Sequence, residues 1–277
     1  MLGYHVSIKG GYAKAAREAA AAGLTAFQYF PKNPRSLTVK RFDRKDALEC
    51  AALCEKHKIV TVAHTPYPTN LAADTEEQQD RTVLSLLNDL DIAESCGSIG
   101  IVVHFGVYKG TEPLTGYQHI IACLNRVAAA WNGKAKLLIE VQSGEHTFMG
   151  TTMEELAQIR RLSSYPEKLA FCLDSCHLFA SGVWRGEVSA EWADKARKLG
   201  VLEQVAAVHF NDSLYPCGQK KDRHARLLQG HIGEAGLQWL ISAPELMNVP
   251  FILETSPDDG GSYEEQLNIM RKWRNQL

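Results

Sequence analysis

The segment Ile99-Gly100-Ile101-Val102-Val103-His104 shows how this chain is built, because five apolar or small residues lead directly to one histidine. A continuous run of this kind is typical of a strand that is buried on both faces. Seven other runs follow the same plan, and each delivers a polar or metal-binding residue at or just beyond its C-terminal end. The eight expected strands are 2–6, 25–30, 59–64, 99–104, 136–140, 169–174, 205–209 and 249–254.

Segments with helical spacing, rich in Ala, Leu, Glu, Lys and Arg, separate these runs. Clear examples are 12–22, 46–57, 76–95 and 116–131. Eight alternations of strand and helix predict an α/β fold, a closed (β/α)8 TIM barrel. In such barrels the C-terminal ends of the strands build the active site, so the residues that end the eight runs are candidates for chemistry.

Length and composition are consistent with one barrel domain that spans residues 1–277, and no linker divides the chain. No run of about 18 apolar residues is present, so neither a membrane span nor a membrane partner is expected. The first seven residues lack the features of a secretory signal and lead into the first strand, which predicts a cytoplasmic protein. The seven cysteines lack zinc-finger spacing and are expected to be reduced. A net charge of −2 argues against indiscriminate binding of polyanions, although bound divalent metals would reverse the sign locally.

Histidines and carboxylates gather at the predicted strand ends. The set comprises His64, His104, Glu140, Asp174, His177, His209, Asp212, Asp222, His224 and Glu254. Imidazole and carboxylate ligands together suit zinc, manganese or iron. Burying so many ionisable groups around one crevice costs several kcal/mol each without countercharge, and metal ions supply that charge. Five histidines and five carboxylates exceed what one ion needs, which indicates a cluster of two or three metals.

Local spacing supports this interpretation in two places. In Asp174-Ser175-Cys176-His177 the Asp ends a strand and the His lies one turn further on, so both can reach the barrel mouth. In Asp222-Arg223-His224, alternation along an extended segment puts the carboxylate and the imidazole on the same side, as in a chelating pair.

From end to end the chain resembles the endonuclease IV family of apurinic/apyrimidinic endonucleases. The most specific matches are Asp174-Ser175-Cys176-His177 and Asp222-Arg223-His224. The other matching segments are 5–7 with Gly10-Gly11, 30–35, 64–67 with Asn70-Leu71, 103–106, 139–140, 172–182, 209–212 and 252–255.

The resemblance implies three zinc ions per chain, with manganese as an alternative at some sites. The implied ligands of the first ion are His64, His104 and Glu140. Glu140 would also bridge to a second ion, held together with Asp174, His209 and Glu254. Those of the third ion are His177, Asp222 and His224.

The reaction that the resemblance implies is cleavage of the DNA backbone 5′ to an abasic site by zinc-hydroxide attack on phosphorus. The products would be a 3′-hydroxyl and a 5′-deoxyribose phosphate. Glu140 and Glu254 would be catalytic, because they would orient the hydroxide as well as bind metal.

The implied partner is double-stranded DNA with abasic sites, bound by a monomer. An abasic-site nuclease must grip the duplex and hold a flipped nucleotide. The family positions that do so are occupied by Lys32, Asn33, Arg35 and Tyr67, with Arg35 and Tyr67 as the wedge. His5 is expected to support the ligands rather than to bind metal.

The chain departs from the family around the ligands. It has Val141 where Asn is usual after the bridging Glu, and Phe105 where Pro is usual in the fourth-strand motif. After His224 the family typically reads His-Ser-Leu-Gly-Glu-Gly, whereas this chain has Ala225-Arg226-Leu227-Leu228-Gln229-Gly230. The ligands stay intact, but groups that surround ligands can change metal affinity or activity about 10–100-fold.

Two alternatives belong to other functional classes. A sugar isomerase or epimerase of the xylose-isomerase-like barrels would need only Glu140, Asp174, His209 and Glu254 around one divalent ion. The surplus ligands at the other strand ends have no use in such an enzyme. A non-catalytic DNA-binding descendant is the second alternative, and the presence of every ligand type counts against it.

Overall fold

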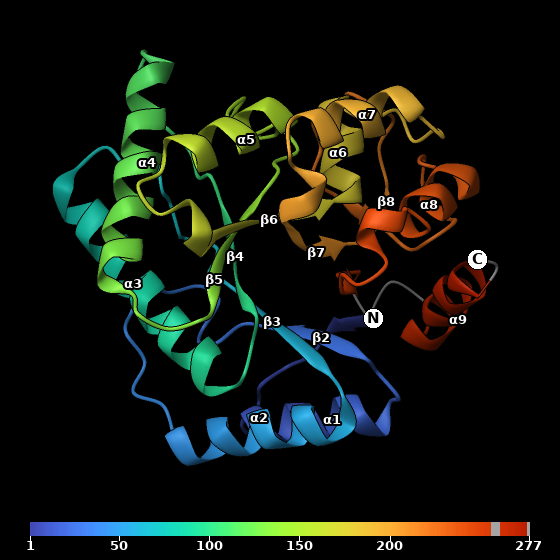
Figure 1. Cartoon of the computed structure of the whole chain (residues 1–277), viewed down its shortest axis with the longest axis horizontal. Helices are drawn as coiled ribbons and strands as arrows, with labels where there is room; N and C mark the ends of the chain where they lie inside the picture. The colour runs from blue at the N-terminus through green and yellow to red at the C-terminus, as the bar shows by residue number, and fades with distance from the viewer. Residues whose placement is uncertain (256–260, 276–277) are drawn as a thin grey trace.

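The computed structural model describes residues 1–255 and 261–275, and it contains eight parallel strands in a closed barrel with helices around it (Figure 1). The predicted (β/α)8 fold is therefore confirmed. The strands are β1 (Leu2–His5), β2 (Ala26–Tyr29), β3 (Val60–His64), β4 (Gly100–His104), β5 (Lys136–Glu140), β6 (Leu169–Asp174), β7 (Val205–His209) and β10 (Phe251–Leu253). Each strand pairs with its sequence neighbour, and β1 closes the barrel against β10.

The helices follow the strands as the sequence spacing predicts, and side chains fix where several of them begin. They are α1 (Tyr12–Ala21), α2 (Arg44–His57), α3 (Glu76–Ser95), α4 (Pro113–Ala130), α5 (Met153–Leu162), α6 (Ser175–Ser181), α7 (Ala190–Lys198), α8 (Glu234–Ile241) and α9 (Tyr263–Arg274). Asp43 caps α2 by accepting from the amides of Lys45 and Asp46. Thr152 and Glu155 form a reciprocal capping box at α5.

Two apolar layers hold the barrel together. The inner layer fills the barrel and consists of Val62, Val102, Leu138, Ala170, Cys172 and Ala207, all buried. The outer layer packs the opposite strand faces against the helices. Because strand side chains alternate, the runs must be apolar on both faces, which is why they are continuous rather than alternating. The strand-end residues lie next to this inner apolar layer, at the mouth of the barrel.

The last strand differs from its prediction, since residues 249–254 were expected and β10 covers only Phe251–Leu253. Pro250 has no amide hydrogen, so it cannot donate to the sheet, although its carbonyl accepts from the Val208 amide at 2.9 Å. At the other end of the strand, the Glu254 amide donates to the Asn211 side chain at 2.8 Å, so Glu254 lies just beyond the strand.

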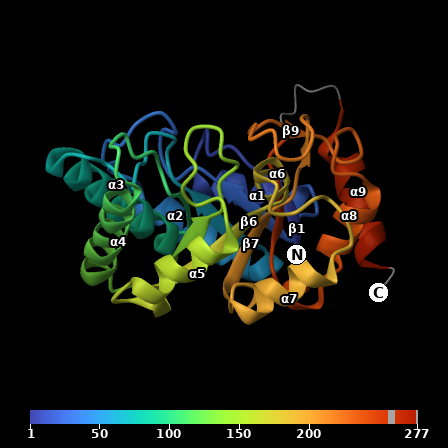
Figure 2. The same cartoon turned by 90° about the horizontal axis from the view of Figure 1, so that it is seen from above.

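The loops at the C-terminal ends of the strands rise on one side of the barrel, as Figure 2 shows for the loop between β5 and α5 and for the hairpin at β9. This hairpin pairs β8 (Asp212–Ser213) with β9 (His224–Ala225). Across the described residues, we find no helix with the length and apolar character that crossing a membrane requires.

Candidate metal centre

Among the described residues, three overlapping groups made of histidine and carboxylate donors alone lie at the C-terminal ends of the strands, and within each group the donor atoms are within 4.8 Å of one another. The groups are His64 with His104 and Glu140; Glu140 with Asp174, His209 and Glu254; and Asp174 with His177 and His224. The structure thus brings together eight of the nine predicted ligands, and Asp222 lies beside the third group.

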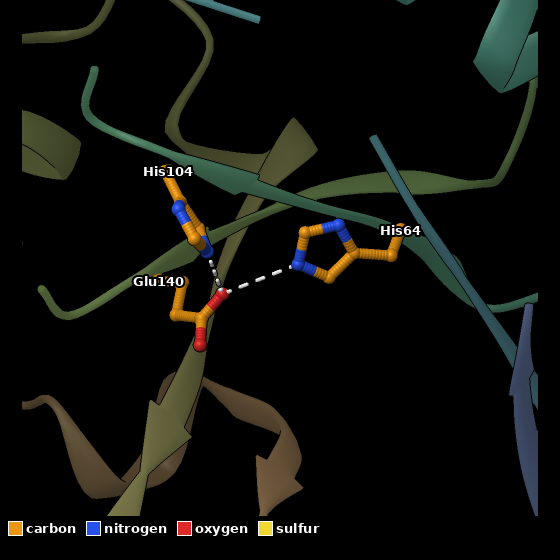
Figure 3. Close-up of side chains that lie close together, drawn as sticks. All are labelled: His64, His104 and Glu140. Atoms are coloured by element: carbon orange, nitrogen blue, oxygen red, sulfur yellow. Dashed lines mark ion pairs between the residues drawn. The ribbon is translucent and has the colours of Figure 1, made fainter. Parts of the chain in front are cut away.

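In the first group, two imidazoles from β3 and β4 point at the same carboxylate oxygen (Figure 3). The Oε2 atom of Glu140 is 2.7 Å from His104 Nε2 and 3.6 Å from His64 Nε2. His64 donates its Nδ1 hydrogen to the Thr65 carbonyl at 2.8 Å. A hydrogen bond of this kind fixes the ring and leaves Nε2 as the atom that can bind metal.

The second group surrounds His209, which ends β7. Its Nδ1 lies 2.8 Å from Glu140 Oε1 and 3.1 Å from Glu254 Oε2, and 3.9 Å from Asp174 Oδ2. Its Nε2 donates to Gln28 Oε1 at 2.7 Å, so Nδ1 is the atom left to face a cation. The two oxygens of Glu140 therefore face different groups.

The third group begins at the junction of β6 and α6. Asp174 ends the strand and caps the helix, because its Oδ1 accepts from the His177 amide at 2.7 Å. This cap explains the three-residue spacing of the two side chains. His177 Nε2 lies 3.1 Å from Asp222 Oδ1, and His224 Nε2 lies 3.4 Å from the same oxygen and 3.5 Å from Asp174 Oδ2.

The charges of the site favour a cation. Burial alone would lower the pKa of His177, but Asp174 and Asp222 outweigh it and raise this pKa well above its usual value. Burial likewise works against protonation of His209, and neighbouring anionic groups, Glu140 among them, raise its pKa. Burial would raise the pKa of Asp222, yet the His177 imidazole lowers it. The field that draws protons onto buried imidazoles also attracts a divalent ion.

Buried donor atoms without good partners provide a test of whether a metal fits. Glu140 Oε2, His177 Nε2 and His224 Nε2 lack a well-formed hydrogen bond, although each has a neighbour within ion-pair distance. Buried polar atoms are rarely left in this state unless an ion or a water completes them. Imidazole nitrogens and carboxylate oxygens in such groups match the ligand set of zinc. The residues present therefore fit the implied metals.

Cys172 comes close to the second group, since its thiol lies among the donor atoms of Glu140 and His209. It belongs to the inner apolar layer of the barrel, and burial raises the pKa of this thiol to about 12. A neutral thiol in this position packs beneath the site.

A cavity of about 400 Å³ opens above the three groups. The aromatic rings of Phe30, Tyr67 and Tyr263 contribute to its wall. The Tyr67 ring is 5.2 Å from the Phe30 ring, which in turn packs 5.4 Å from His64. Tyr67 is 69% exposed, so an aromatic face stands at the rim of the cavity, next to the first group.

The residues of the loop after β2 that are predicted to contact DNA differ in their exposure to solvent. Asn33 and Arg35 are exposed, and the Asn33 side chain accepts from the Arg35 amide at 3.0 Å. The Pro34 carbonyl accepts from the Tyr67 amide at 2.8 Å, which ties this loop to the loop after β3. Both wedge candidates therefore stand on neighbouring loops.

The structure places Lys32 differently from the prediction that it contacts DNA. Its side chain is 2% exposed, and its ammonium lies 3.0 Å from Asp89 Oδ1 in α3. It also donates to the carbonyl and the hydroxyl of Ser85, at 3.1 and 2.8 Å. An ammonium that points into the protein cannot contact DNA, so the predicted DNA contact of Lys32 is wrong, and the residue instead fastens the rim loop to α3.

Asp212 also differs from the expectation that it belongs with the strand-end donors. Its carboxylate accepts from the amides of Ser213, Gly230 and Ile232 at 2.8 to 3.1 Å. These bonds use its oxygens for folding the loop that follows β7, and no donor group includes it. A strand-end position alone could not reveal this, since the spacing does not give the direction of the side chain.

Two polar residues of the site were missed by the sequence analysis. Gln28 is fully buried in β2; its Nε2 donates to Glu254 Oε1 at 2.6 Å and lies 3.4 Å from His5 Nδ1. Asn211 donates to Asp174 Oδ2 at 3.2 Å and accepts from the Glu254 amide at 2.8 Å. For Gln28 the available signal was a lone amide within an apolar run, because a buried amide needs partners.

The departures around the ligands leave the donor geometry in place. The Val141 carbonyl accepts from His177 Nδ1 at 2.8 Å, a backbone contact that does not depend on the side chain. Phe105 packs against Gly150, where a Cβ would come within 2.4 Å of the ring. Arg226 donates to the carbonyls of Gly261 and Ser262, which ties the segment after β9 to the start of α9.

Comparisons with known proteins agree with this geometry. A family model described as a xylose isomerase-like TIM barrel matches residues 16–273. A protein of Symbiobacterium thermophilum named "Probable endonuclease 4" is 38% identical over 270 residues, which cover 98% of each chain. A protein of the same name from Heliobacterium modesticaldum is 37% identical over 274 residues, again with 98% of each covered. The crystal structure of endonuclease IV from Thermus thermophilus has a TM-score of 0.86 at 35% identity and covers 100% of this chain and 99% of that one.

Sugar epimerases share the barrel at much lower identity. The crystal structure of a D-tagatose 3-epimerase-like protein has a TM-score of 0.75 at 17% identity, over 99% of this chain and 98% of the other. Similarity at this level reflects the fold alone.

Proposed function

The chain belongs to the endonuclease IV family of xylose isomerase-like TIM barrels, whose members are metal-dependent DNA-repair nucleases, and on that premise we propose that it incises duplex DNA 5′ to abasic sites. The cut leaves a 3′-hydroxyl and a 5′-deoxyribose phosphate, and it depends on three zinc ions. One observation carries this proposal: three overlapping groups of buried donors share one barrel mouth.

The side chains of the site have different roles, which follow from their positions. Glu140 joins the first two groups, because its Oε2 faces the imidazoles of β3 and β4 while its Oε1 faces His209. Gln28 keeps His209 Nδ1 and Glu254 turned towards the same point. Bound in these groups, zinc ions would supply a nucleophilic water at neutral pH and neutralise charge on the phosphate and the leaving oxygen.

The rim supplies the DNA-binding surface of the proposal. Arg35 and Tyr67 stand exposed on adjacent loops that a backbone hydrogen bond joins, next to the cavity above the donor groups. A guanidinium and an aromatic ring can occupy the gap that opens when a duplex is kinked and a nucleotide flips out. Asn33, exposed in the same loop, adds a polar group for the backbone.

Metal content and cleavage measured on the same preparations test the proposal. Elemental analysis should find about three zinc ions per chain, and chelation should abolish cleavage of a duplex with one abasic site. Zinc or manganese should restore cleavage. The control is an undamaged duplex of the same sequence at the same salt concentration, because phosphate contacts are sensitive to salt.

Two outcomes would reject the proposal. Full cleavage by metal-stripped protein would remove the metal ions from the mechanism. A single ion per chain, with epimerisation of a ketose and no incision, would favour the sugar epimerase, for which Glu140, Asp174, His209 and Glu254 suffice.

A further inference from the structure

Glu145 lies in the loop between β5 and α5, where this loop meets the segment that leads into β9. Figure 2 shows the loop and the hairpin on the same side of the barrel. The Glu145 side chain is only 8% exposed, although it carries a charge and lies in a loop. A carboxylate in this position needs partners, and the facing segment provides them.

The partners of Glu145 are three consecutive residues. Its Oε2 accepts from the Asp222 amide at 2.9 Å and from the Arg223 guanidinium at 3.0 Å. Its Oε1 accepts from the Lys221 ammonium at 3.3 Å. Charge-assisted bonds of this kind are shorter and stronger than neutral ones, and here they converge on one carboxylate.

The clamped segment also lies beside the third group and leads into it. Asp222 lies close to His177, and His224 follows two residues later on the same extended segment. The Cys176 thiol and the Leu214 amide hold the segment further along, where both contact the Arg223 carbonyl. The amide of Asp222 itself donates to Glu145, so this bond fixes the backbone from which the Asp222 carboxylate projects.

We propose that Glu145 is a positioning residue that clamps the segment Lys221-Asp222-Arg223 against the loop after β5 and thereby sets the affinity for the third metal ion. The inference rests on the proposed function, which places an ion among His177, Asp222 and His224. Glu145 does not touch that ion; it acts through the position of Asp222.

Zinc affinity and hydrogen exchange in the zinc-loaded full chain test the clamp. Glu145→Ala should weaken one of the three ions by about 10–100-fold in a titration against a competing chelator, while the other two keep the parent affinity. Raised free zinc should refill the third site and restore cleavage. Amide exchange at Asp222 should rise in this variant, because the acceptor of its hydrogen bond is gone.

Two further variants make the test specific. Glu145→Gln keeps an acceptor for the Asp222 amide and loses only the charge, so its third ion should bind more tightly than in Glu145→Ala. Glu154→Ala is the matched control, since Glu154 pairs with Lys195 at 2.7 Å between α5 and α7. It should leave zinc affinity and exchange at Asp222 unchanged.

The clamp is overturned if Glu145→Ala binds three ions as the parent does, or if exchange at Asp222 does not change. Should Glu145→Ala fail to fold, Glu145→Gln still decides, because a third ion of parent affinity in this variant would refute the charged clamp. A parent protein with fewer than three zinc ions would refute the proposed function instead, and exchange at Asp222 would still report whether Glu145 holds the segment.

Discussion

Two clusters of buried ionisable groups lie near the barrel mouth, and they differ in how their charge is balanced. Between the loop after β2 and α3, Lys32 and Asp89 form one ion pair at 3.0 Å, and Ser85 accepts the remaining hydrogens of the ammonium. At the strand ends, four carboxylates pair with imidazoles and accept from neutral amides such as those of Gln28 and Asn211, and neither lysine nor arginine is found among the described residues that line the cavity.

This difference in charge balance distinguishes a structural ion pair from a group of residues that can bind metal. A buried charge that has its own countercharge finds its partner within the fold, whereas a group of carboxylates without a permanent cation favours one from outside. Mutations in the pair Lys32–Asp89, the closed pair, should therefore change the stability of the fold. Mutations among the strand-end carboxylates and imidazoles, the open cluster, should change metal binding and turnover.

The largest effect is expected at the centre of the open cluster. Glu140→Gln should lower the turnover of an abasic duplex by about 1,000-fold, or about 4 kcal/mol in the barrier, because this carboxylate joins two donor groups. The fold should persist, since an amide of the same shape replaces the carboxylate. Steady-state cleavage and thermal unfolding measure the two quantities, and a variant within a few-fold of the parent would remove Glu140 from the centre.

The closed pair should behave in the opposite way. Lys32→Met leaves the Asp89 carboxylate buried without its cation and should lower the free energy of unfolding by about 3–5 kcal/mol. The double variant Lys32→Met with Asp89→Leu should regain most of this loss, because an apolar pair of similar volume avoids the unpaired charge. Urea unfolding of the three proteins measures both changes. A Lys32→Met protein of parent stability that binds DNA weakly would return Lys32 to the DNA interface.

The same contrast shows what the sequence could predict. The run 136–140 coincides with β5, because its apolar residues lead up to one carboxylate, which ends the strand. The Asp174 and His177 spacing likewise predicted a strand end followed by one helical turn, which the cap at α6 confirms. Apolar runs and caps are local properties, so the sequence displays them directly.

The direction of a side chain is not a local property. Lys32 and Asp212 lie at predicted strand ends or in the loops just beyond, yet one points into a pair with α3 and the other binds three amides of its own loop. Gln28 lies inside a predicted strand, and its partners His209 and Glu254 come from distant parts of the sequence. Such contacts depend on packing between segments, which spacing along the chain does not encode.

A smaller effect is expected at the rim. Arg35→Ala combined with Tyr67→Ala should weaken binding to an abasic duplex by about tenfold to a hundredfold, since stacking contributes about 1–3 kcal/mol per base. Binding to the undamaged duplex should change far less, and the zinc content should stay the same. Equilibrium binding to matched duplexes at fixed salt measures this. If the double variant binds and cuts as the parent does, other rim loops recognise the lesion.

The smallest effect, measured per pH unit, is a pH dependence that belongs to the closed pair. Burial raises the pKa of Asp89 to about 7, although the neighbouring Lys32 lowers it. A folded-state pKa above the unfolded one means that the folded protein holds this proton more tightly. The contribution of Asp89 to the free energy of unfolding is therefore complete below about pH 4 and is lost as the pH rises towards 7, at no more than about 1.4 kcal/mol per pH unit.

Asp89→Asn isolates this dependence, because the amide cannot titrate while every other group of the molecule stays the same. In urea unfolding of metal-free proteins, the stability of the parent relative to Asp89→Asn should fall between pH 4 and 7 and level off above. Asp91→Asn is the matched control, since Asp91 pairs with Arg44 on the surface and should give no comparable slope. A relative stability that stays flat between pH 4 and 7 would mean that Lys32 keeps the Asp89 carboxylate ionised throughout, so that the pair would be closed by charge alone.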